Sequence, residues 1–312
     1  MAKIFCIANQ KGGVGKTTTT VNLAAGLAKV GQRVLMIDLD PQGNATMGSG
    51  IDKRQLELTV YDVLLESASV AEARVKADKL VEGGCGYDVL GANRELAGAE
   101  VEMVALDRRE KRLRTALAAV GAEYDFVLID CPPSLSLLTL NGLCAAHGVI
   151  VPMQCEYFAL EGLTDLVNTI KQVHANLNKN LQIIGLLRVM FDPRITLQQQ
   201  VSEQLKSHFG DKVFDTVIPR NVRLAEAPSY GLPGVVFDPA ARGSQAFIAF
   251  AQELIEKMPP ASAFASGAVA PPIAPVERIA PDLPIPDDVM APAAAPAAAS
   301  ASTSDSPSEN NA

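Results

Sequence analysis

The stretch Lys11-Gly12-Gly13-Val14-Gly15-Lys16-Thr17-Thr18 follows directly on the apolar run Ile4-Phe5-Cys6-Ile7-Ala8, an order typical of a buried strand that leads into a phosphate-binding loop. Glycines let the backbone turn tightly enough for consecutive N–H groups to point at one anion, and the helix after the loop offers the same phosphates its positive end. The stretch therefore predicts a nucleotide site. We expect Lys16 to meet the β- and γ-phosphates and Thr17 to supply a hydroxyl to Mg²⁺.

The loop departs from the common pattern G-x-x-x-x-G-K-[ST] at one position. Gln10 stands where the first glycine is expected, and a second lysine, Lys11, follows it. A lone Gly-Lys-Thr triplet also fits an ordinary helix start. Three glycines and two lysines between a strand and a helix favour phosphate binding over that alternative.

The composition indicates a globular protein of the cytoplasm. The 312 residues are 48% hydrophobic and 20% charged, and no apolar run approaches the ~20 residues that span a bilayer. The 5 cysteines are odd in number and show no C-x-x-C spacing, which favours free thiols in a reducing compartment over disulfides or a zinc site. We expect no structural metal and no membrane partner.

The composition changes at Pro259. Residues 259–312 hold 11 of the 20 prolines, 16 alanines and one aromatic residue, Phe264. Such a segment buries too little apolar surface to offset the entropy of ordering it, so we expect a disordered tail after one domain over residues 1–258. The tail has six acidic residues and one arginine, which leaves a net charge of −3 for residues 1–258. Bulk charge therefore does not indicate nucleic-acid binding, which would need a local basic patch.

Short apolar runs alternate with helix-length segments along residues 1–258. Beyond the first run, the expected strands are residues 33–38, 87–91, 126–130, 148–152, 182–189 and, as a weaker pattern, 212–218. This alternation predicts an α/β fold of the P-loop NTPase type, with a mostly parallel sheet and helices on both faces. Ligands in such folds bind beyond the carboxyl ends of the strands.

Two of the expected strands end in carboxylates. Asp38 and Asp40 lie in Ile37-Asp38-Leu39-Asp40-Pro41, and Asp130 lies in Ile129-Asp130-Cys131-Pro132-Pro133. Asp130 has the setting of the aspartate that supports Mg²⁺ in P-loop proteins. The prolines after Asp40 and after Asp130 favour stiff loops whose position can depend on the γ-phosphate. The alternative is that both are ordinary turns at strand ends.

Five motifs together resemble the deviant-Walker ATPases of the ParA/MinD superfamily, and more narrowly the ParA/Soj chromosome-partitioning ATPases. The resemblance covers nearly all of residues 2–256. The motifs are Asn9-Gln10-Lys11-Gly12-Gly13-Val14-Gly15-Lys16-Thr17-Thr18, Asp38-Leu39-Asp40-Pro41-Gln42-Gly43-Asn44-Ala45-Thr46, Asp130-Cys131-Pro132-Pro133-Ser134, Gln154-Cys155-Glu156-Tyr157 and Ile218-Pro219-Arg220-Asn221-Val222-Arg223-Leu224-Ala225-Glu226-Ala227-Pro228.

The resemblance implies that two lysines act on different nucleotides. Lys16 binds phosphate within its own subunit, and Lys11 reaches across a dimer to the partner's nucleotide, as an arginine finger supplied in trans does. Gly12 stays small because two subunits meet there. A cation that arrives only on dimerisation makes hydrolysis slow in the monomer.

The resemblance also implies roles for the other site residues. Thr17 ligates Mg²⁺ with support from Asp130, Thr18 contacts a phosphate, and Asp40 orients or activates the attacking water. ATP is favoured over GTP because the nearest segment to a guanine-type Asn-Lys-x-Asp run, residues 178–181, ends in leucine. The expected nucleotide contacts are Lys11, Gly12, Gly13, Val14, Gly15, Lys16, Thr17, Thr18, Pro219 and Asn221, and the expected catalytic residues are Lys11, Lys16 and Asp40.

A DNA-binding surface is also implied by the resemblance. Arg194 and Arg223 belong to a basic surface that dimerisation completes, with Arg188, Lys206 and Arg220 as further members. Such a patch binds any sequence by releasing counterions from phosphates. The residues alone, without the resemblance, favour solvated arginines or ion pairs within the subunit.

The function that follows is a weak ATPase, associated with the nucleoid, that dimerises on ATP, coats double-stranded DNA and is released by a ParB-type centromere-binding protein. Two alternatives stay open. One is a membrane-associated ATPase of the MinD kind. The apolar stripe of Phe247, Phe250, Leu254 and their neighbours lies opposite a mostly acidic helix face, which suits core packing rather than binding to anionic lipid. The other is a nucleotide-gated scaffold without significant turnover.

Overall fold

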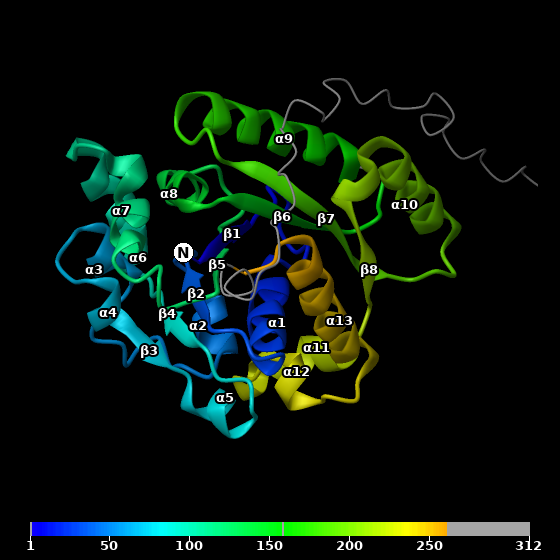
Figure 1. The fold of residues 1–312 in the computed structure, drawn as a ribbon, viewed down its shortest axis with the longest axis horizontal. Helices are drawn as coiled ribbons and strands as arrows, with labels where there is room; N and C mark the ends of the chain where they lie inside the picture. The colour runs from blue at the N-terminus through cyan, green and yellow to red at the C-terminus, as the bar shows by residue number, and fades with distance from the viewer. Residues whose placement is uncertain (1, 158, 261–312) are drawn as a thin grey trace, which may run out of the picture.

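One eight-stranded sheet organises the chain in the computed structural model, which describes residues 2–157 and 159–260. The strand order is β3-β4-β2-β5-β1-β6-β7-β8, and every pairing is parallel except that of β3 with β4 (Figure 1). The strands are β1 (Lys3–Ile7), β2 (Val34–Asp38), β3 (Arg74–Lys76), β4 (Asp88–Leu90), β5 (Phe126–Asp130), β6 (Gly148–Met153), β7 (Gln182–Phe191) and β8 (Val213–Pro219).

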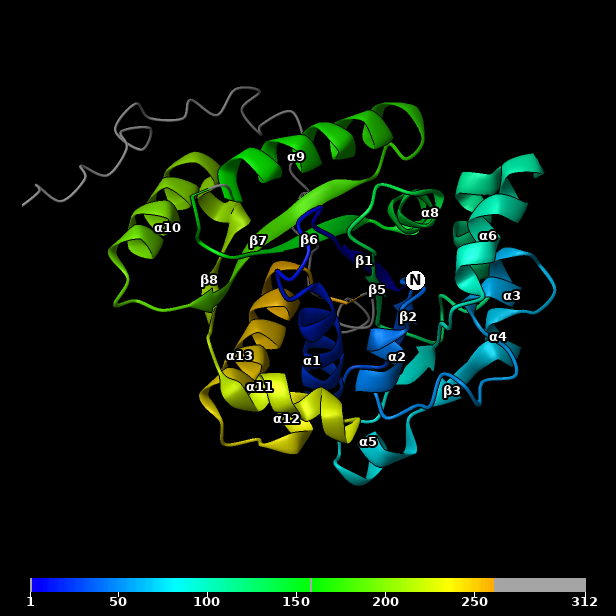
Figure 2. The same ribbon diagram turned by 180° about the vertical axis from the view of Figure 1, so that it is seen from behind.

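Helices connect the strands and cover both faces of the sheet (Figures 1 and 2). They are α1 (Lys16–Lys29), α2 (Asn44–Gly48), α3 (Val60–Leu64), α4 (Val70–Ala73), α5 (Asp78–Glu82), α6 (Leu96–Glu102), α7 (Arg112–Ala118), α8 (Leu137–Ala145), α9 (Ala159–Asn176), α10 (Thr196–Phe209), α11 (Val222–Glu226), α12 (Gly234–Phe237) and α13 (Arg242–Lys257). The 3₁₀ turns are η1 (Met103–Ala105), η2 (Arg109–Lys111), η3 (Gly210–Lys212) and η4 (Ala227–Tyr230).

The side chains of β1 show how the sheet separates two cores. Phe5 and Ile7 pack into the core under α1 and α13, whereas Cys6 points to the opposite face and the core under α8 and α9. Successive residues of a strand face opposite sides, so a strand buried on both faces reads as a continuous apolar run. The expected α/β architecture of the P-loop NTPase type, with a mostly parallel sheet, is confirmed.

The seven strands expected from the sequence are present, with ends shifted by a residue or two. The eighth, β3, was missed. It is a short antiparallel edge strand whose residues, Arg-Val-Lys, are only partly buried or exposed. A three-residue edge strand carries no buried apolar run, so the pattern that found the others could not find it.

The topology brings the sequence motifs to one edge of the sheet. β1 lies between β5 and β6. At this point in the sheet the connections that leave neighbouring strands pass to opposite sides, and the loop after β1 emerges there. Parallel register places Asp38, at the end of β2, beside Asp130, at the end of β5. The loop and both strand-end carboxylates therefore meet at the carboxyl edge, where this kind of fold binds ligands.

The apolar stripe of α13 faces the interior. Phe247, Phe250, Ala251 and Leu254 are at most 1% exposed and pack against α1 and β8. This agrees with the core-packing reading of the stripe. Within residues 2–157 and 159–260, no helix combines the length and apolar character that crossing a membrane requires. The expected disordered tail falls, apart from Pro259 and Pro260, outside the described residues.

Candidate nucleotide-binding site

The phosphate loop has the conformation that its glycines predict. Gly13 and Gly15 have φ angles of +73° and +77°, in the left-handed region that residues with a side chain rarely adopt. Gly15 is the residue that precedes α1, so the first N–H groups of that helix are free to bind an anion beside the loop. A Cβ atom added at Gly12 would meet nothing of the same subunit within 4 Å.

Lys16 is a buried cation at the first turn of α1. It is 8% exposed, and its Nζ donates to the carbonyl of Lys11 at 3.0 Å. Burial lowers the pKa of the lysine, and the charges of Asp130, Cys131 and Asp40 oppose that shift. In the described part of the chain its ammonium makes no ion pair with a carboxylate. A buried ammonium that is held by one carbonyl lacks a compensating negative charge, and a bound anion would supply that charge.

Asp130 lies beneath the loop and is held by two hydroxyls of α1. Thr17 Oγ1 donates to its Oδ2 at 2.8 Å, and Thr20 Oγ1 donates to its Oδ1 at 2.9 Å. Burial, followed by the charge of Asp38, raises the pKa of Asp130 to about 8. Thr20 was not expected, although it lies three residues after Thr17 on the same face of the helix, which is the signal that would have found it.

Asp38 forms a second buried carboxylate beside Asp130. Its Oδ2 accepts from the backbone N–H and the hydroxyl of Thr46, each at 2.8 Å. Burial raises the pKa of Asp38 to about 6, against the hydrogen bonds from Thr46 that lower it. Two adjacent buried carboxylates repel each other, and a divalent cation nearby would relieve that repulsion. The hydroxyl of Thr17 and the carboxylate of Asp130 are oxygen donors of the kind that Mg²⁺ takes, so these residues fit the metal.

Asp40 lies in a tight turn at the carboxyl edge and is partly buried. Its Oδ1 accepts from the N–H of Gln42 at 2.9 Å, and its carbonyl accepts from the N–H of Gly43. Gly43 has φ +61°, and a Cβ there would come within 2.6 Å of the carbonyl of Ala92. A short hydrogen-bonded turn that requires glycine therefore sets where the Asp40 carboxylate lies.

Lys11 is exposed and pairs with a carboxylate of its own subunit. Its Nζ lies 2.6 Å from Oε2 of Glu156, and the two side chains are 43% and 46% exposed. Gln154, two residues earlier, donates to the carbonyl of Gly13 at 3.2 Å. The sequence flagged residues 154–157 as a motif without assigning them a role. In the structure this segment supports the phosphate loop from the β6 side.

Two cavities flank the start of α1, and Thr18 and Leu224 line both. The smaller, about 180 Å³, is lined by Pro219 and Asn221 together with Gly15 of the loop. Asn221 Oδ1 accepts from the N–H of Leu224 and so caps α11. The hydroxyl of Thr19 is buried in the wall of this cavity without a hydrogen-bond partner among the described residues.

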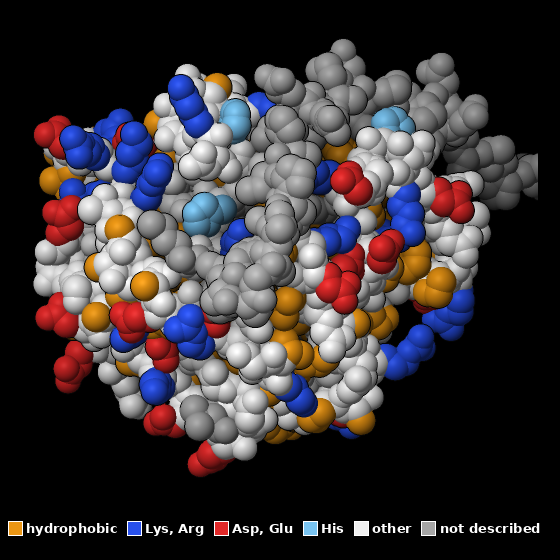
Figure 3. All heavy atoms as spheres, viewed as in Figure 1, with side chains coloured by type: hydrophobic (Ala, Val, Ile, Leu, Met, Phe, Trp, Pro, Cys, Tyr) orange, Lys and Arg blue, Asp and Glu red, His pale blue; other side chains and the backbone are white. Residues whose placement is uncertain are grey.

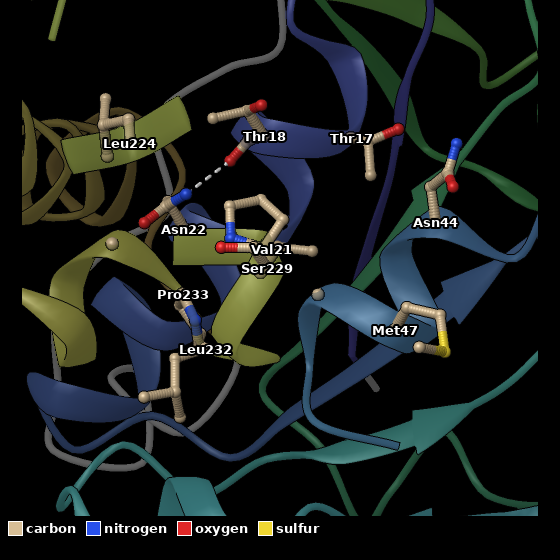
Figure 4. A pocket seen from close by; sticks show the side chains of 13 residues that line it. Thr17, Thr18, Val21, Asn22, Asn44, Met47, Leu224, Ser229, Leu232 and Pro233 are labelled. Atoms are coloured by element: carbon tan, nitrogen blue, oxygen red, sulfur yellow. Dashed lines mark hydrogen bonds between the residues drawn. The ribbon is translucent and has the colours of Figure 1, made fainter. Parts of the chain in front are cut away.

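The larger cavity, about 460 Å³, runs along α1 beside the phosphate loop (Figure 4). Figure 4 shows Thr17 and Thr18 on α1, with Asn44 and Met47 of α2 on one side of the cavity and Leu224 and Leu232 on the other. Asn22 closes the wall, since its Nδ2 donates to the carbonyl of Thr18 at 2.9 Å and its Oδ1 accepts from Val235. Residues of α1, of α2 and of the segment that follows β8 thus line this cavity.

The arginines expected on the DNA surface do not all reach it. Arg188 is 4% exposed and donates to the hydroxyl of Ser202 and to the carbonyls of Phe214 and Asp215. The expectation that Arg188 joins a basic surface is therefore wrong. It lies on β7, a strand buried on both faces, and its guanidinium ties β7 to β8 and α10 instead.

Arg194 and Arg223 are exposed and paired within the subunit. Arg194, 87% exposed at its side chain, donates to both carboxylate oxygens of Asp192, and this contact lowers the pKa of Asp192 to about 2. Arg223 pairs with Glu226 and Asp238. Lys206 and Arg220 are exposed as well. Exposed surface pairs such as these contribute little to stability, so both arginines stay free to exchange partners.

Comparison with known proteins gives the chain its family. Residues 2–183 match the family model described as an AAA domain. The chain is 52% identical over 254 residues to the sporulation initiation inhibitor protein Soj of Bacillus subtilis, across 81% of this chain and 98% of that protein. It is 51% identical over 257 residues to the chromosome partitioning protein ParA of Caulobacter vibrioides, across 82% of this chain and 94% of that protein.

A solved structure supports the same fold. The Mycobacterium smegmatis protein described as cobyrinic acid a,c-diamide synthase, with a bound ATP analogue and magnesium, is 36% identical. It superposes with a TM-score of 0.71 over 88% of this chain and 100% of that one. The extent of the sequence identity, the phosphate loop with its two lysines and the paired strand-end carboxylates agree: the chain belongs to the ParA/Soj family of chromosome-partitioning ATPases.

Proposed function

We propose that this chain is an ATP-dependent dimerising switch that coats double-stranded DNA without sequence preference and is released when a ParB-type partner stimulates hydrolysis. The observation that carries the proposal is the contrast between the two lysines of one loop. Lys16 is buried and points into its own subunit, whereas Lys11 is exposed on a surface ion pair. A cation so placed is available to a second copy of the chain.

The buried half of the site binds and orients the nucleotide. Lys16 and the free N–H groups at the start of α1 hold the phosphates, with Thr18 among them. Thr17 and Asp130 would hold Mg²⁺, which when bound neutralises charge on the phosphate oxygens. Pro219 and Asn221 line the cavity beside Thr18 and receive the adenine there. The ATP analogue and the magnesium bound in the Mycobacterium smegmatis relative support ATP and Mg²⁺ as the ligands.

Dimerisation completes the catalytic half. Lys11 leaves Glu156 and meets the partner's nucleotide, and the open space beside Gly12 accommodates the approaching subunit. An exposed ion pair is worth about 0–1 kcal/mol, so the exchange costs little. Asp40, fixed by its turn, accepts a hydrogen bond from the attacking water and aligns it. Weak turnover in the monomer follows, because one of the two cations is then missing.

Replacing Asp40 by alanine should separate binding from turnover. Asp40→Ala removes the carboxylate that aligns the water and leaves Lys16, Thr17 and Asp130 in place. ATP affinity is expected to change less than about threefold, while kcat falls about 100-fold or more. Titration with a fluorescent ATP analogue and a phosphate-release assay measure the two quantities. If turnover is unaffected, Asp40 has no catalytic role, and if wild-type protein shows no turnover either, the chain is a nucleotide-gated scaffold.

DNA binding is proposed for the surface that carries Arg194 and Arg223. Arg194 follows β7, Arg223 lies on α11, and Arg220 is close enough to Asp192 to contribute to the lowering of its pKa. The three arginines therefore gather near the ends of β7 and β8. Doubled in a symmetric dimer, a few arginines neutralise enough phosphates to bind any sequence with marked salt dependence. The nucleoid association of the protein rests on this surface.

The double substitution Arg194→Glu with Arg223→Glu is expected to weaken binding to a random-sequence duplex about 100-fold while ATP affinity is retained. Fluorescence anisotropy of a labelled duplex at fixed salt checks it. A matched control is Lys29→Glu with Lys179→Glu, which makes the same charge change at exposed positions beside the amino ends of the strands. Equal losses in both variants would show that net charge alone matters and would remove the arginine surface from the proposal.

A further inference from the structure

Three apolar side chains within six residues are exposed on α6, on η1 and directly after η1. Val101 is 75% exposed, Val104 59% and Leu106 36%. The same segment buries Leu96, Ala99 and Met103 in the core, so its inner face is already packed. Single exposed apolar residues are common, but a cluster of this kind at one place marks a contact surface.

Cations follow these apolar residues along the chain. Arg108, Lys111 and Arg114 follow within eight residues of Leu106, and within residues 2–157 and 159–260 none of the three makes an ion pair, unlike Arg112, which pairs with Glu66. Arg109 of η2 donates to the carbonyl of Val104 in η1 at 2.6 Å and so links the two turns. Figure 3 shows Lys and Arg side chains beside hydrophobic ones at the upper left, where Figure 1 places α6 and α7. We call Val101, Val104, Leu106, Arg108, Lys111 and Arg114 the α6–α7 patch.

The chemistry of the patch suits a peptide better than DNA. A valine side chain adds nothing to phosphate binding, whereas the apolar side chains of a peptide can pack against it. Glu102, Asp107 and Glu110 stand among the cations and lower the net positive charge of the patch toward any anionic partner. Apolar residues bordered by unpaired cations complement a short segment that is both apolar and acidic.

The chain carries one such segment in its own tail. Residues 281–290 read Pro-Asp-Leu-Pro-Ile-Pro-Asp-Asp-Val-Met, four apolar side chains among three aspartates. The rest of the tail is mainly Ala, Pro and Ser. The Soj and ParA relatives are matched over 94–98% of their length but over only 81–82% of this chain, so this chain has a length that those relatives lack. We propose that residues 281–290 dock on the α6–α7 patch of the same chain.

The connection is long enough for this contact. The 20 residues between Pro260 and Pro281 can extend to about 65 Å at ~3.3 Å per residue. A domain of this size has a radius of gyration of about 18 Å and hence a diameter of about 46 Å, which the extended connection exceeds. A tethered segment also has an effective concentration of about a millimolar, which makes a weak contact sufficient.

Photo-crosslinking in the full-length protein tests the proposal. Benzoylphenylalanine replaces Leu283 in one preparation and Ala301, outside the segment, in a control, and mass spectrometry maps the crosslinks. Crosslinks from position 283 should fall on residues 96–114 of the same chain, at a yield independent of protein concentration. Position 301 should give at least fivefold fewer. Crosslinks from position 283 that are spread over the surface, or that join two chains, would overturn the proposal.

Charge swaps test the electrostatic part. Arg108→Glu with Lys111→Glu should lower the crosslink yield about fivefold, and adding Asp287→Lys with Asp288→Lys should restore it. Lys29→Glu with Lys179→Glu, the same charge change elsewhere, should leave the yield unchanged. Loss without rescue would contradict the pairing. If a random-sequence duplex displaces the crosslinks and the patch substitutions weaken duplex binding, DNA is the occupant and the proposal is wrong.

Discussion

Lys16→Ala is expected to abolish ATP binding, with affinity reduced about 100-fold or more. Lys16 is a buried ammonium that is hydrogen-bonded to the carbonyl of Lys11, beneath the loop where phosphates are expected. With ATP bound, Lys16 and a phosphate would form a buried ion pair. Removing one partner of such a pair costs about 3–5 kcal/mol, and 1.4 kcal/mol is a factor of ten in affinity. Titration with a fluorescent ATP analogue in the presence of Mg²⁺ measures the change.

The folded state should tolerate this substitution. Alanine is favourable in a helix, and Lys16 is the first residue of α1. The unfolding temperature without nucleotide is expected to stay within a few degrees of wild type, which separates a lost ligand contact from a lost fold. Lys29→Ala, in the last turn of the same helix, is the matched control and should bind ATP normally. Tight ATP binding by Lys16→Ala would show that the loop does not hold phosphates as described.

Asp130→Asn is expected to change stability and metal binding in opposite directions. Burial and the charge of Asp38 raise the pKa of Asp130 to about 8, because ionisation of this carboxyl is unfavourable in the folded protein. A raised folded-state pKa contributes stability that is present below the unfolded value of 3.8 and lost as the pH rises through about 8. The free energy of unfolding of the ligand-free protein should therefore fall across this window.

Asparagine removes the ionisation, and its Oδ1 accepts from one of the two hydroxyls of Thr17 and Thr20 while its Nδ2 donates to the other. At pH 8 the ligand-free variant should be about 1–3 kcal/mol more stable than wild type, a gain that shrinks toward pH 5. Its Mg²⁺-dependent ATP affinity should nonetheless fall, because the carboxylate that fits the metal is gone. Thermal unfolding at several pH values and ATP titration with and without Mg²⁺ check both parts. A variant less stable than wild type at pH 8 would contradict the account of this carboxyl.

The sequence predicted that the loop and the strand-end carboxylates lie at one edge of the sheet, because each of them directly follows or ends a strand. The glycines, Lys16 and Thr17 follow one strand directly, and Asp130 ends another, so the parallel topology alone brings them together. The expectation for Arg188 came from the family resemblance, and it was wrong. It placed an arginine on a surface, but β7 is covered on both sides, and the buried guanidinium instead bonds carbonyls of β8. Burial of one residue in a central strand depends on neighbours far along the chain.

Contacts between distant segments were also out of reach of the sequence. The pairing of Lys11 with Glu156 joins loops 145 residues apart, and the hold of Thr46 on Asp38 depends on how α2 turns back over β2. The exposed side chains of the α6–α7 patch gave no signal either, since Val101 and Val104 lie in a helical segment whose apolar residues read equally well as core.

Binding to a random-sequence duplex in three nucleotide states tests the central claim most directly. Fluorescence anisotropy is measured with ATP, with ADP and without nucleotide, each at two salt concentrations. The account predicts binding with ATP alone, weakened steeply by salt, because only the ATP dimer doubles the arginine surface. Equal duplex binding in all three states, or no binding with ATP although the protein dimerises, would contradict it.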